Sequence, residues 1–428
     1  MAQKIIIGAS LVLLATAYGV IAERNQHRIA SLVDEALQIR FVLFDQPWYL
    51  HKDGGSTRLL HKQADAMMPG LTKLVHFSGR QELAVSVINS DGDIIHQWPI
   101  SWFDIWPDAD HLAYFRRPKS APGTMIHGAE ILANGDLLFN FEYLGMVRLD
   151  ACGKVIWRLA EQTHHSIDID DEGFIWTSAH QHPTVGKNSM PLHWPYYIEP
   201  YLYRISPAGK VVDKQSVLQI LADNQLYGAL YLSSLHNTDP VVKGDTLHVN
   251  DVEVFPATLA EGFIKHGDIM VSMRNINSIM IVEPGSWRVK HWISGMMLRQ
   301  HDPDFLDGNT IAVYDNNNRF AADDPQAFSR ILRIHLPDNR VETIFQGSPQ
   351  LPFYSKTLGK QQWLANGNIL FSDSEKGRVM EITDDGRLVW LYANRIDQHY
   401  SAAVQEAERL PAMMNADFFA RQRRQCQP

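Results

Sequence analysis

The chain has 428 residues, of which 45% are hydrophobic and 20% charged, an ordinary composition for a folded protein long enough to bury a large core. Its formal net charge of −9 argues against a nucleic-acid partner, because such a partner requires a basic surface. Two cysteines, Cys152 and Cys426, are too few for a disulfide-rich scaffold or a cysteine zinc site. They could bond to each other, a pairing that the sequence alone leaves open.

An uncharged apolar run, Ile5 to Ala22, follows Lys4 near the N-terminus. A run of this length can cross a bilayer as a helix, and it also fits a secretory signal. We therefore expect residues 1–22 to be a signal anchor or a signal peptide and the rest of the chain to be exported. The expected location is the periplasm or another extracytoplasmic face, with residues 5–22 anchored in the inner membrane.

Residues 23–69 are predicted to be a tether and lead-in to the folded part. Glu23–Arg40 carries apolar residues at helical spacing, which indicates a helix. Asp53–Thr57 reads Asp-Gly-Gly-Ser-Thr, which is typical of a loop.

Six similar hairpins recur through residues 70–398. Each pairs two β-rich strands across a turn that contains Gly, Asp or Asn, and successive copies lie roughly 45 to 75 residues apart, as four-stranded propeller blades do. The hairpins are Ala84–Trp98, Val147–Trp157, Leu202–Val212, Ile279–Trp292, Ile331–Phe345 and Val379–Trp390. The sequence therefore predicts an all-β fold, a six-bladed β-propeller behind an N-terminal transmembrane or signal helix. A β-sandwich is the alternative, but it would not repeat one turn motif six times.

Residues 399–428 are predicted to be a C-terminal helical tail. Ser401–Arg421 is rich in Ala, Glu, Leu and Met, which favour helices, although Pro411 should break or restart the helix.

Four histidines occupy one position of the repeated unit, at the head of the innermost strand of consecutive blades. They are His127, His165, His248 and His301. Innermost strands line the central channel of a propeller, so residues at one repeat position converge there, and channel mouths are common binding sites. In the sixth blade Gln361 or Gln362 takes the equivalent place, and the first blade has no clear equivalent. We therefore expect at least three of these histidines to face a shared site.

Several ordered elements resemble the bacterial arylsulfate sulfotransferases. His248-Val-Asn250 followed by Ser272-Met-Arg274 is similar to a His-x-Asn element and the Ser-x-Arg after it. The segment with Gln300-His301, Gly308-Asn309, Tyr314-Asp315-Asn316 and Arg319 resembles the one that carries the sulfated histidine of that family. His164-His165 before an Asp-Glu-Gly turn resembles a third histidine element, and Gly377–Trp390 is typical of the last blade. The resemblance covers about residues 80–395.

The resemblance implies an exported six-bladed propeller that does not use a nucleotide sulfate donor. Such a protein would move a sulfuryl group from a phenolic sulfate ester to a phenolic acceptor through a sulfohistidine intermediate. Its partners would be a small aryl sulfate and a phenol, with membrane contact through the N-terminal segment, and no cofactor is expected.

Each candidate catalytic residue has side-chain chemistry that suits one role in such a transfer. A neutral imidazole is a competent nucleophile, which suits His301. Arg274 and His248 can donate hydrogen bonds to the negatively charged oxygens of the group in transit. His165, or its neighbour His164, can protonate the departing phenolate and deprotonate the incoming phenol. The candidate substrate-binding residues are His127, His164, Asn250 and Gln300.

Two other classes of function stay open on the sequence alone. The first is a metal-dependent, hydrolase-like propeller, since imidazoles with carboxylates suit a transition metal and carboxylates alone suit calcium. The residues for such a metal are His248, Asp251, Glu253, His301, Asp302 and Asp304, although no compact metal spacing is present. The second is a non-catalytic propeller that binds a ligand or a protein, but a scaffold has no need of Arg274 among channel histidines.

Overall fold

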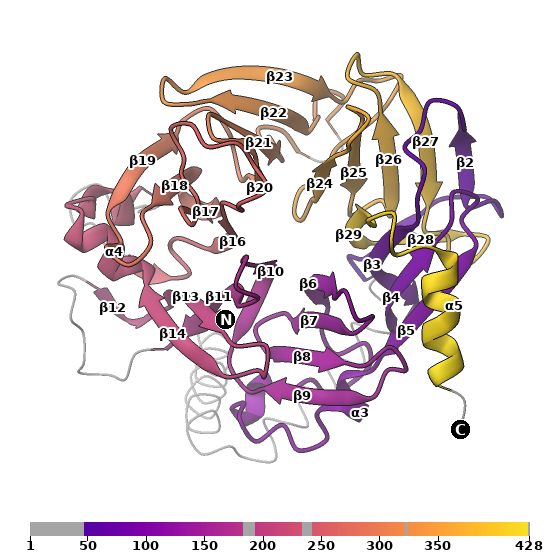
Figure 1. Ribbon diagram of the computed structural model, residues 1–428, viewed down its shortest axis with the longest axis horizontal. Helices are drawn as coiled ribbons and strands as arrows, with labels where there is room; N and C mark the ends of the chain where they lie inside the picture. The colour runs from indigo at the N-terminus through magenta and orange to yellow at the C-terminus, as the bar shows by residue number, and fades with distance from the viewer. Residues whose placement is uncertain (1–46, 183–192, 233–241, 322–323, 427–428) are drawn as a thin grey trace, which may run out of the picture.

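The computed structural model describes residues 47–182, 193–232, 242–321 and 324–426, with no side chains described at 193–196, 242 and 243. Six antiparallel sheets surround one axis, which confirms the six-bladed propeller (Figure 1). The apolar run at 5–22 and the helix predicted at 23–40 lie outside the described residues. Among those that are described, no helix has the length and apolar character needed to span a membrane.

Each blade has four strands that follow one another from the axis outward, the innermost strand being first. Blade one is β29 (Val404–Arg409), β3 (Thr72–Gly79), β4 (Glu82–Ile88) and β5 (Ile94–Ile100). Blade two is β6 (Ile126–Ile131), β7 (Leu137–Phe141), β8 (Gly145–Leu149) and β9 (Val155–Leu159). Blade three is β10 (Thr163–Ile169), β11 (Ile175–Gln181), β13 (Glu199–Ile205) and β14 (Val211–Ser216).

The second half of the ring repeats the arrangement. Blade four is β16 (Val249–Val254), β17 (Ile269–Met273), β18 (Ser278–Val282) and β19 (Val289–Ser294). Blade five is β20 (His301–Asp307), β21 (Thr310–Asp315), β22 (Arg330–His335) and β23 (Arg340–Gln346). Blade six is β24 (Gln361–Trp363), β25 (Ile369–Asp373), β26 (Arg378–Ile382) and β27 (Leu388–Ala393).

Shorter strands and helices lie in the connections around the ring. The strands beyond the four of each blade are β1 (Leu50–Lys52), β2 (Leu59–Lys62), β12 (His193–Tyr197), β15 (Val242–Gly244) and β28 (Tyr400–Ala402). The helices of the described residues are α3 (Trp102–Ile105), α4 (Val217–Asp223) and α5 (Ala416–Gln425), with 3-10 turns η1 (Tyr114–Arg116), η2 (Tyr227–Tyr231) and η3 (Arg274–Ile276).

All six predicted hairpins are the third and fourth strands of a blade, counted from the axis, and their turns show why the prediction succeeded. In blade one the side-chain oxygen of Asn89 accepts the backbone N–H groups of Asp91 and Asp93, both at 2.9 Å. Asp150 makes the same two bonds in the turn between β8 and β9. This local hydrogen bonding depends only on residues close in sequence, so the turn can be recognised without tertiary information.

The C-terminal segment differs from the predicted helical tail. Tyr400–Ala402 pairs with Leu50–Lys52, and Val404–Arg409 pairs with β3 as the innermost strand of blade one, so helix begins only at Ala416. Arg409 is buried and its Nη2 lies 2.9 Å from Glu381 Oε2, a contact that only the closed ring provides. Sheet pairing and this buried ion pair therefore override the helical propensity of the segment.

The lead-in also belongs to the sheets, since Leu59–Lys62 adds a fifth strand to blade six beside β27. At the other end of the chain, a disulfide joins Cys152, in the turn after β8, to Cys426 after α5. α5 lies beside β5 in Figure 1, so this bond ties the C-terminal helix to the neighbouring blade two.

Candidate functional site

The heads of the inner strands are irregular at the positions of the predicted histidines. The strand register breaks between Ile126 and Ala129 in β6 and between His164 and Ile167 in β10. Equivalent breaks follow Val249 in β16 and His301 in β20. Such bulges turn side chains away from the regular alternation of a sheet, and in this protein they occur where the blades meet the axis.

The backbone at these bulges is tightly constrained. His165 and His248 have φ angles of 58° and 51°, a region that non-glycine residues rarely adopt. At Gly128 φ is 91°, and a Cβ atom would lie 1.8 Å from the carbonyl oxygen of His165. Only glycine allows blades two and three to approach this closely beside the histidines.

A pocket of about 1010 Å³ lies at this end of the axis. Its polar lining includes His127, Glu142, His165, Arg274 and His301, which come from blades two to five. Its apolar walls include Trp48, Tyr49, Phe77, Phe115, Met125 and Leu358. Three of the four predicted histidines therefore share one pocket, and the fourth, His248, contacts it through His165, with 3.2 Å between their Nε2 atoms.

His301 is held in a single tautomer. Its Nδ1 lies 2.7 Å from Asn316 Oδ1 and 3.1 Å from the carbonyl oxygen of Arg299, and both oxygens can only accept, so Nδ1 carries the proton. The Asn316 amide is itself oriented, because its Nδ2 donates to the carbonyl oxygens of Ser355 and Leu358.

Nε2 of His301 consequently carries the lone pair. Among the described residues it has no hydrogen-bond partner. Burial, together with the charge of Arg274, lowers the pKa of His301 well below its usual value, so the ring is neutral near neutral pH.

Arg274 is a partly buried cation with no carboxylate partner in the described part of the chain. Its Nε and Nη2 lie 3.4 Å from Asn275 Oδ1, and Asp245, whose charge also acts on Arg274, forms its ion pair with His248. Burial lowers the pKa of Arg274, but a guanidinium remains protonated near neutral pH. An unpaired guanidinium in a pocket is a ready partner for an anion.

A chain of hydrogen bonds joins three imidazoles, of which His165 lines the pocket. Asp245 bonds Nδ1 of His248, whose Nε2 lies 3.2 Å from Nε2 of His165. Nδ1 of His165 lies 2.6 Å from Nδ1 of His164. Burial lowers the pKa of all three histidines, so each carries one proton near neutral pH.

The carboxylate of Asp245 determines where those protons lie. Burial opposes its ionisation, yet the hydrogen bond from His248 lowers the pKa of Asp245, so His248 Nδ1 is the donor. His248 Nε2 must then accept from His165 Nε2–H, and His165 Nδ1 must accept from His164 Nδ1–H. The remaining nitrogen, His164 Nε2, then carries a lone pair and no proton. It has no hydrogen-bond partner among the described residues, so no buried N–H group is left without an acceptor.

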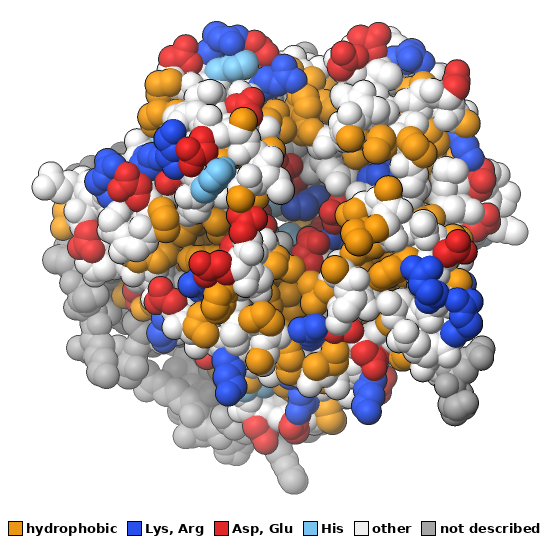
Figure 2. Space-filling model, viewed as in Figure 1, with side chains coloured by type: hydrophobic (Ala, Val, Ile, Leu, Met, Phe, Trp, Pro, Cys, Tyr) orange, Lys and Arg blue, Asp and Glu red, His pale blue; other side chains and the backbone are white. Residues whose placement is uncertain are grey.

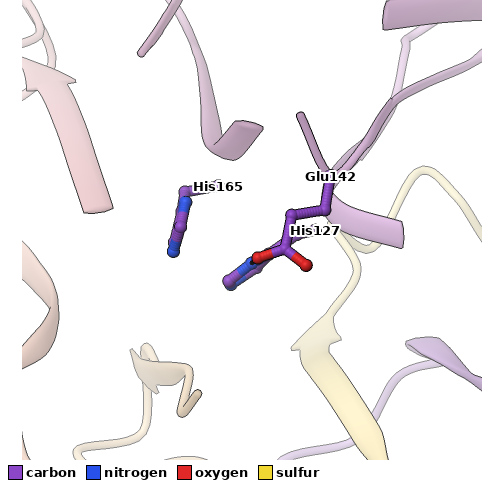
Figure 3. Close-up of side chains that lie close together, drawn as sticks. All are labelled: His127, Glu142 and His165. Atoms are coloured by element: carbon purple, nitrogen blue, oxygen red, sulfur yellow. Dashed lines mark hydrogen bonds and ion pairs between the residues drawn. The ribbon is translucent and has the colours of Figure 1, made fainter. Parts of the chain in front are cut away.

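His127 and Glu142 form a separate pair beside His165 (Figure 3). His127 Nδ1 lies 3.4 Å from Glu142 Oε1, and the His127 and His165 ring centroids are 3.9 Å apart. Donor atoms of the three residues lie within 4.8 Å of one another, a spacing that a metal ion could in principle use. Both nitrogens of His165 are engaged by other imidazoles, however, and its ring packs against that of His127. The arrangement fits hydrogen bonding better than metal ligation.

The metal set suggested by the sequence is divided between two places. Asp251, Glu253 and Asp304 line a second pocket of about 380 Å³, whereas His301 lines the first. Asp302 forms an ion pair with Lys360, at 2.5 Å, and accepts the backbone N–H of Gln361. Figure 2 shows charged side chains gathered at the central hollow of one face of the molecule.

Burial raises the pKa of Asp251 to about 8, and burial beside Asp302 raises that of Asp304 well above its usual value. These carboxylates lie further along their strands than the histidines and do not line the first pocket.

The remaining predicted substrate-binding residues lie behind the pocket wall. Asn250 Nδ2 donates to the carbonyl oxygen of Gln300 at 2.8 Å, and Gln300 Nε2 donates to Ser272 Oγ and to Ser278, so these amides join blades four and five. His164 is fully buried behind His165. Of the four, only His127 lines the pocket.

Glu142 and Asp245 are the functional candidates that the sequence does not reveal. Glu142 follows β7 and Asp245 follows β15, so both lie in connections outside the repeated strand pattern. The repeat in the sequence predicts which residues occupy equivalent positions on the strands. It does not predict the positions of residues in the loops between them.

Comparisons with known proteins identify one matching family. The sequence matches the family described as "Arylsulfotransferase (ASST)" over residues 128–395. No curated protein matches the chain significantly. Among solved structures, a protein of unknown function from Bacteroides caccae is 12% identical, over 79% of this chain and 98% of that chain, with a TM-score of 0.47. The streptogramin B lyase structure is 11% identical, over 85% of this chain and 98% of that chain, with a TM-score of 0.39. Likenesses this remote carry no argument about activity.

Proposed function

The chain belongs to the arylsulfotransferase family, and from that premise we propose that it moves a sulfuryl group from a phenolic sulfate ester to a phenolic acceptor through a sulfohistidine at His301. The observation that carries the proposal is the pairing, in one pocket, of a neutral imidazole with a free Nε2 lone pair and a guanidinium without a carboxylate partner among the described residues. The first is a nucleophile, and the second binds an anion.

In the first half-reaction, the Nε2 lone pair of His301 attacks the sulfur atom of the donor. The bond between sulfur and the aryl oxygen breaks, and its electron pair leaves with the aryloxide. Arg274 donates to the non-bridging sulfuryl oxygens, whose negative charge it offsets throughout the transfer. In the second half-reaction a phenol oxygen attacks the same sulfur atom, and the electron pair of the N–S bond returns to Nε2.

The Nδ1 proton of His301 stays in place during both steps. Its acceptors are an amide oxygen and a backbone carbonyl oxygen, which do not take up a proton near neutral pH. The intermediate is therefore an N-sulfoimidazolium, whose ring is a better leaving group than a neutral N-sulfoimidazole would be.

The pocket walls support an aryl substrate. Trp48, Phe77 and Phe115 offer flat apolar surfaces beside the polar residues, and aromatic rings bind such surfaces through area burial and stacking. His248 was expected to donate beside Arg274. Both of its nitrogens are engaged by Asp245 and His165, so we assign it to orienting His165.

We also propose that the protein acts outside the cytoplasm. The Cys152–Cys426 disulfide supports this location, because such bonds persist in oxidising compartments. The apolar run at residues 5–22 supports export through a signal anchor or a signal peptide.

The test of the function is intact-mass analysis of the full chain after mixing with 4-nitrophenyl sulfate. We expect a mass increase of one sulfuryl group, lost on addition of a phenol with formation of the new aryl sulfate. Peptide mapping should locate the group on His301. Release of inorganic sulfate without any protein adduct, or an adduct elsewhere, would contradict the mechanism.

A further inference from the structure

We propose that His127, positioned by Glu142, is the group that exchanges a proton with the aryl oxygen. The proposal rests on the sulfuryl transfer proposed above and adds the proton carrier to it. His165 is the carrier expected from the sequence, so the assignment depends on which of these two neighbouring imidazoles is free to act.

His165 is not free at either nitrogen. Its Nε2 proton is donated to His248, and its Nδ1 lone pair accepts from His164. Burial among other histidines holds its pKa well below the usual value, which opposes uptake of a second proton. A side chain with both nitrogens in hydrogen bonds to other imidazoles has no lone pair to offer a substrate hydroxyl group.

His127 differs on each of these points. Its Nδ1 faces the Glu142 carboxylate at 3.4 Å, which places the proton of the neutral ring on Nδ1 and leaves the lone pair on Nε2. Within the described residues Nε2 has no hydrogen-bond partner, and the side chain lines the same pocket as His301 and Arg274. A carboxylate at one nitrogen stabilises the imidazolium that forms when the other takes up a proton.

The two residues reach this arrangement from adjacent strands. His127 lies in the bulge of β6, and Glu142 directly follows β7, the next strand of blade two. Figure 3 shows the Glu142 carboxylate beside the His127 ring, with the His165 ring on the other side. Glu142 is therefore a positioning residue, and His127 is the one that meets the substrate.

His127 loses one proton in the first half-reaction and regains one in the second. With the donor bound, the imidazolium of His127 gives its Nε2 proton to the aryl oxygen as the S–O bond breaks, and His127 becomes neutral. In the second half-reaction, the acceptor phenol returns a proton to Nε2 as its oxygen attacks sulfur. Glu142 neither gives nor takes a proton in either step, and no proton is gained or lost overall.

The test compares two donors that differ in leaving-group basicity. The 4-nitrophenolate ion leaves readily without protonation, whereas the much more basic phenolate of phenyl sulfate needs it. Rapid-quench intact-mass measurements on the full chain would give the rate of adduct formation for both donors. The variants are His127→Ala and Glu142→Gln, and the control is His266→Ala, a surface histidine of the β16–β17 connection.

We expect His127→Ala to lower the rate with phenyl sulfate about 10²- to 10⁴-fold and the rate with 4-nitrophenyl sulfate less than about tenfold. Glu142→Gln should show the same selectivity with a smaller loss, and the control should match the wild type. A purely structural role would lower both rates equally and would overturn the proposal.

A second outcome would also overturn it. If EDTA abolished adduct formation and Zn²⁺ restored it in the wild type but not in His127→Ala, the residue would be a metal ligand instead. Absence of any adduct in the wild type would instead contradict the proposed function itself, so the two failures are distinguishable.

Discussion

Nδ1 of His301 lies 2.7 Å from the side-chain oxygen of Asn316, a group that accepts a hydrogen bond but does not remove the proton. Since the Asn316 amide also donates to two backbone carbonyl groups, the contact is fixed from both sides. This pair determines which nitrogen of His301 attacks and what charge the sulfated ring carries.

The first prediction concerns Asn316→Asp. A carboxylate can take the Nδ1 proton from the sulfated ring and so stabilise a neutral N-sulfohistidine, a poorer leaving group. We expect the adduct to form and then persist, with slower transfer to a phenol, as followed by intact mass after the acceptor is added. Asn316→Ala, which removes the oxygen altogether, is the matched control and should not accumulate the adduct. Rapid turnover by Asn316→Asp would contradict this account of the intermediate.

The second prediction concerns the nucleophile. His301→Ala should remove the adduct and lower turnover by several orders of magnitude, as loss of a covalent nucleophile does. Thermal unfolding should show that the variant still folds. Normal activity in a folded His301→Ala protein would place the covalent step on another residue or remove it from the mechanism.

The third prediction concerns the guanidinium of Arg274. Removing a preorganised donor to a transition-state oxygen costs about 10²- to 10³-fold in kcat, so Arg274→Ala should lose activity on that scale while its melting temperature changes little. Arg288→Ala is the control, since that arginine is exposed and paired with Glu283. Equal kinetics for the two variants would show that Arg274 does not contact the group in transit.

The fourth prediction is a pH dependence. Burial and the charge of Arg274 lower the pKa of His301, so the neutral, nucleophilic ring persists as the pH falls below the usual histidine value. Adduct formation from 4-nitrophenyl sulfate should therefore stay constant well below pH 6.5, about the value for an unperturbed histidine. In Arg274→Ala the acid limb of the profile should move to higher pH. An unchanged limb would mean that the two charges do not interact.

The fifth prediction concerns the disulfide. Cys152→Ser should lower the free energy of unfolding by about 2 to 5 kcal/mol, because the bond closes a long loop in the unfolded chain. The pocket is lined by other residues, so transfer by the folded variant should be unchanged. Cys426→Ser and the double variant should lose the same amount, since all three remove one bond. Additive losses in urea unfolding would show that the cysteines act separately.

The sequence was informative wherever a feature depended on neighbours along the chain. The turns at Asn89 and Asp150 are built from local hydrogen bonds, so the hairpins and the number of blades could be predicted. The register of those repeats in turn located His127, His165 and His301 at one level of the ring.

Features that depend on the closed ring could not be read in this way. Val404–Arg409 has the composition of a helix and becomes a strand because β3 offers it an open edge. The tautomers of His165 and His248 follow from Asp245, which approaches from a loop. Whether His165 can exchange a proton with a substrate is a property of that network, and the residue type alone does not determine it.

Blade one takes its inner strand from Val404–Arg409 and its other three from Thr72–Ile100. During translation, more than three hundred residues are added to the chain after β3 before β29, the strand that completes its sheet, is synthesised. Until then the backbone N–H and C=O groups along that edge of β3 lack their partner, an edge prone to pairing with other chains. Every residue that lines the first pocket precedes β29, so a chain cut short at residue 403 would contain all of them but lack the inner strand of blade one. Closure of the ring around the histidines therefore depends on a strand that is synthesised after all of them.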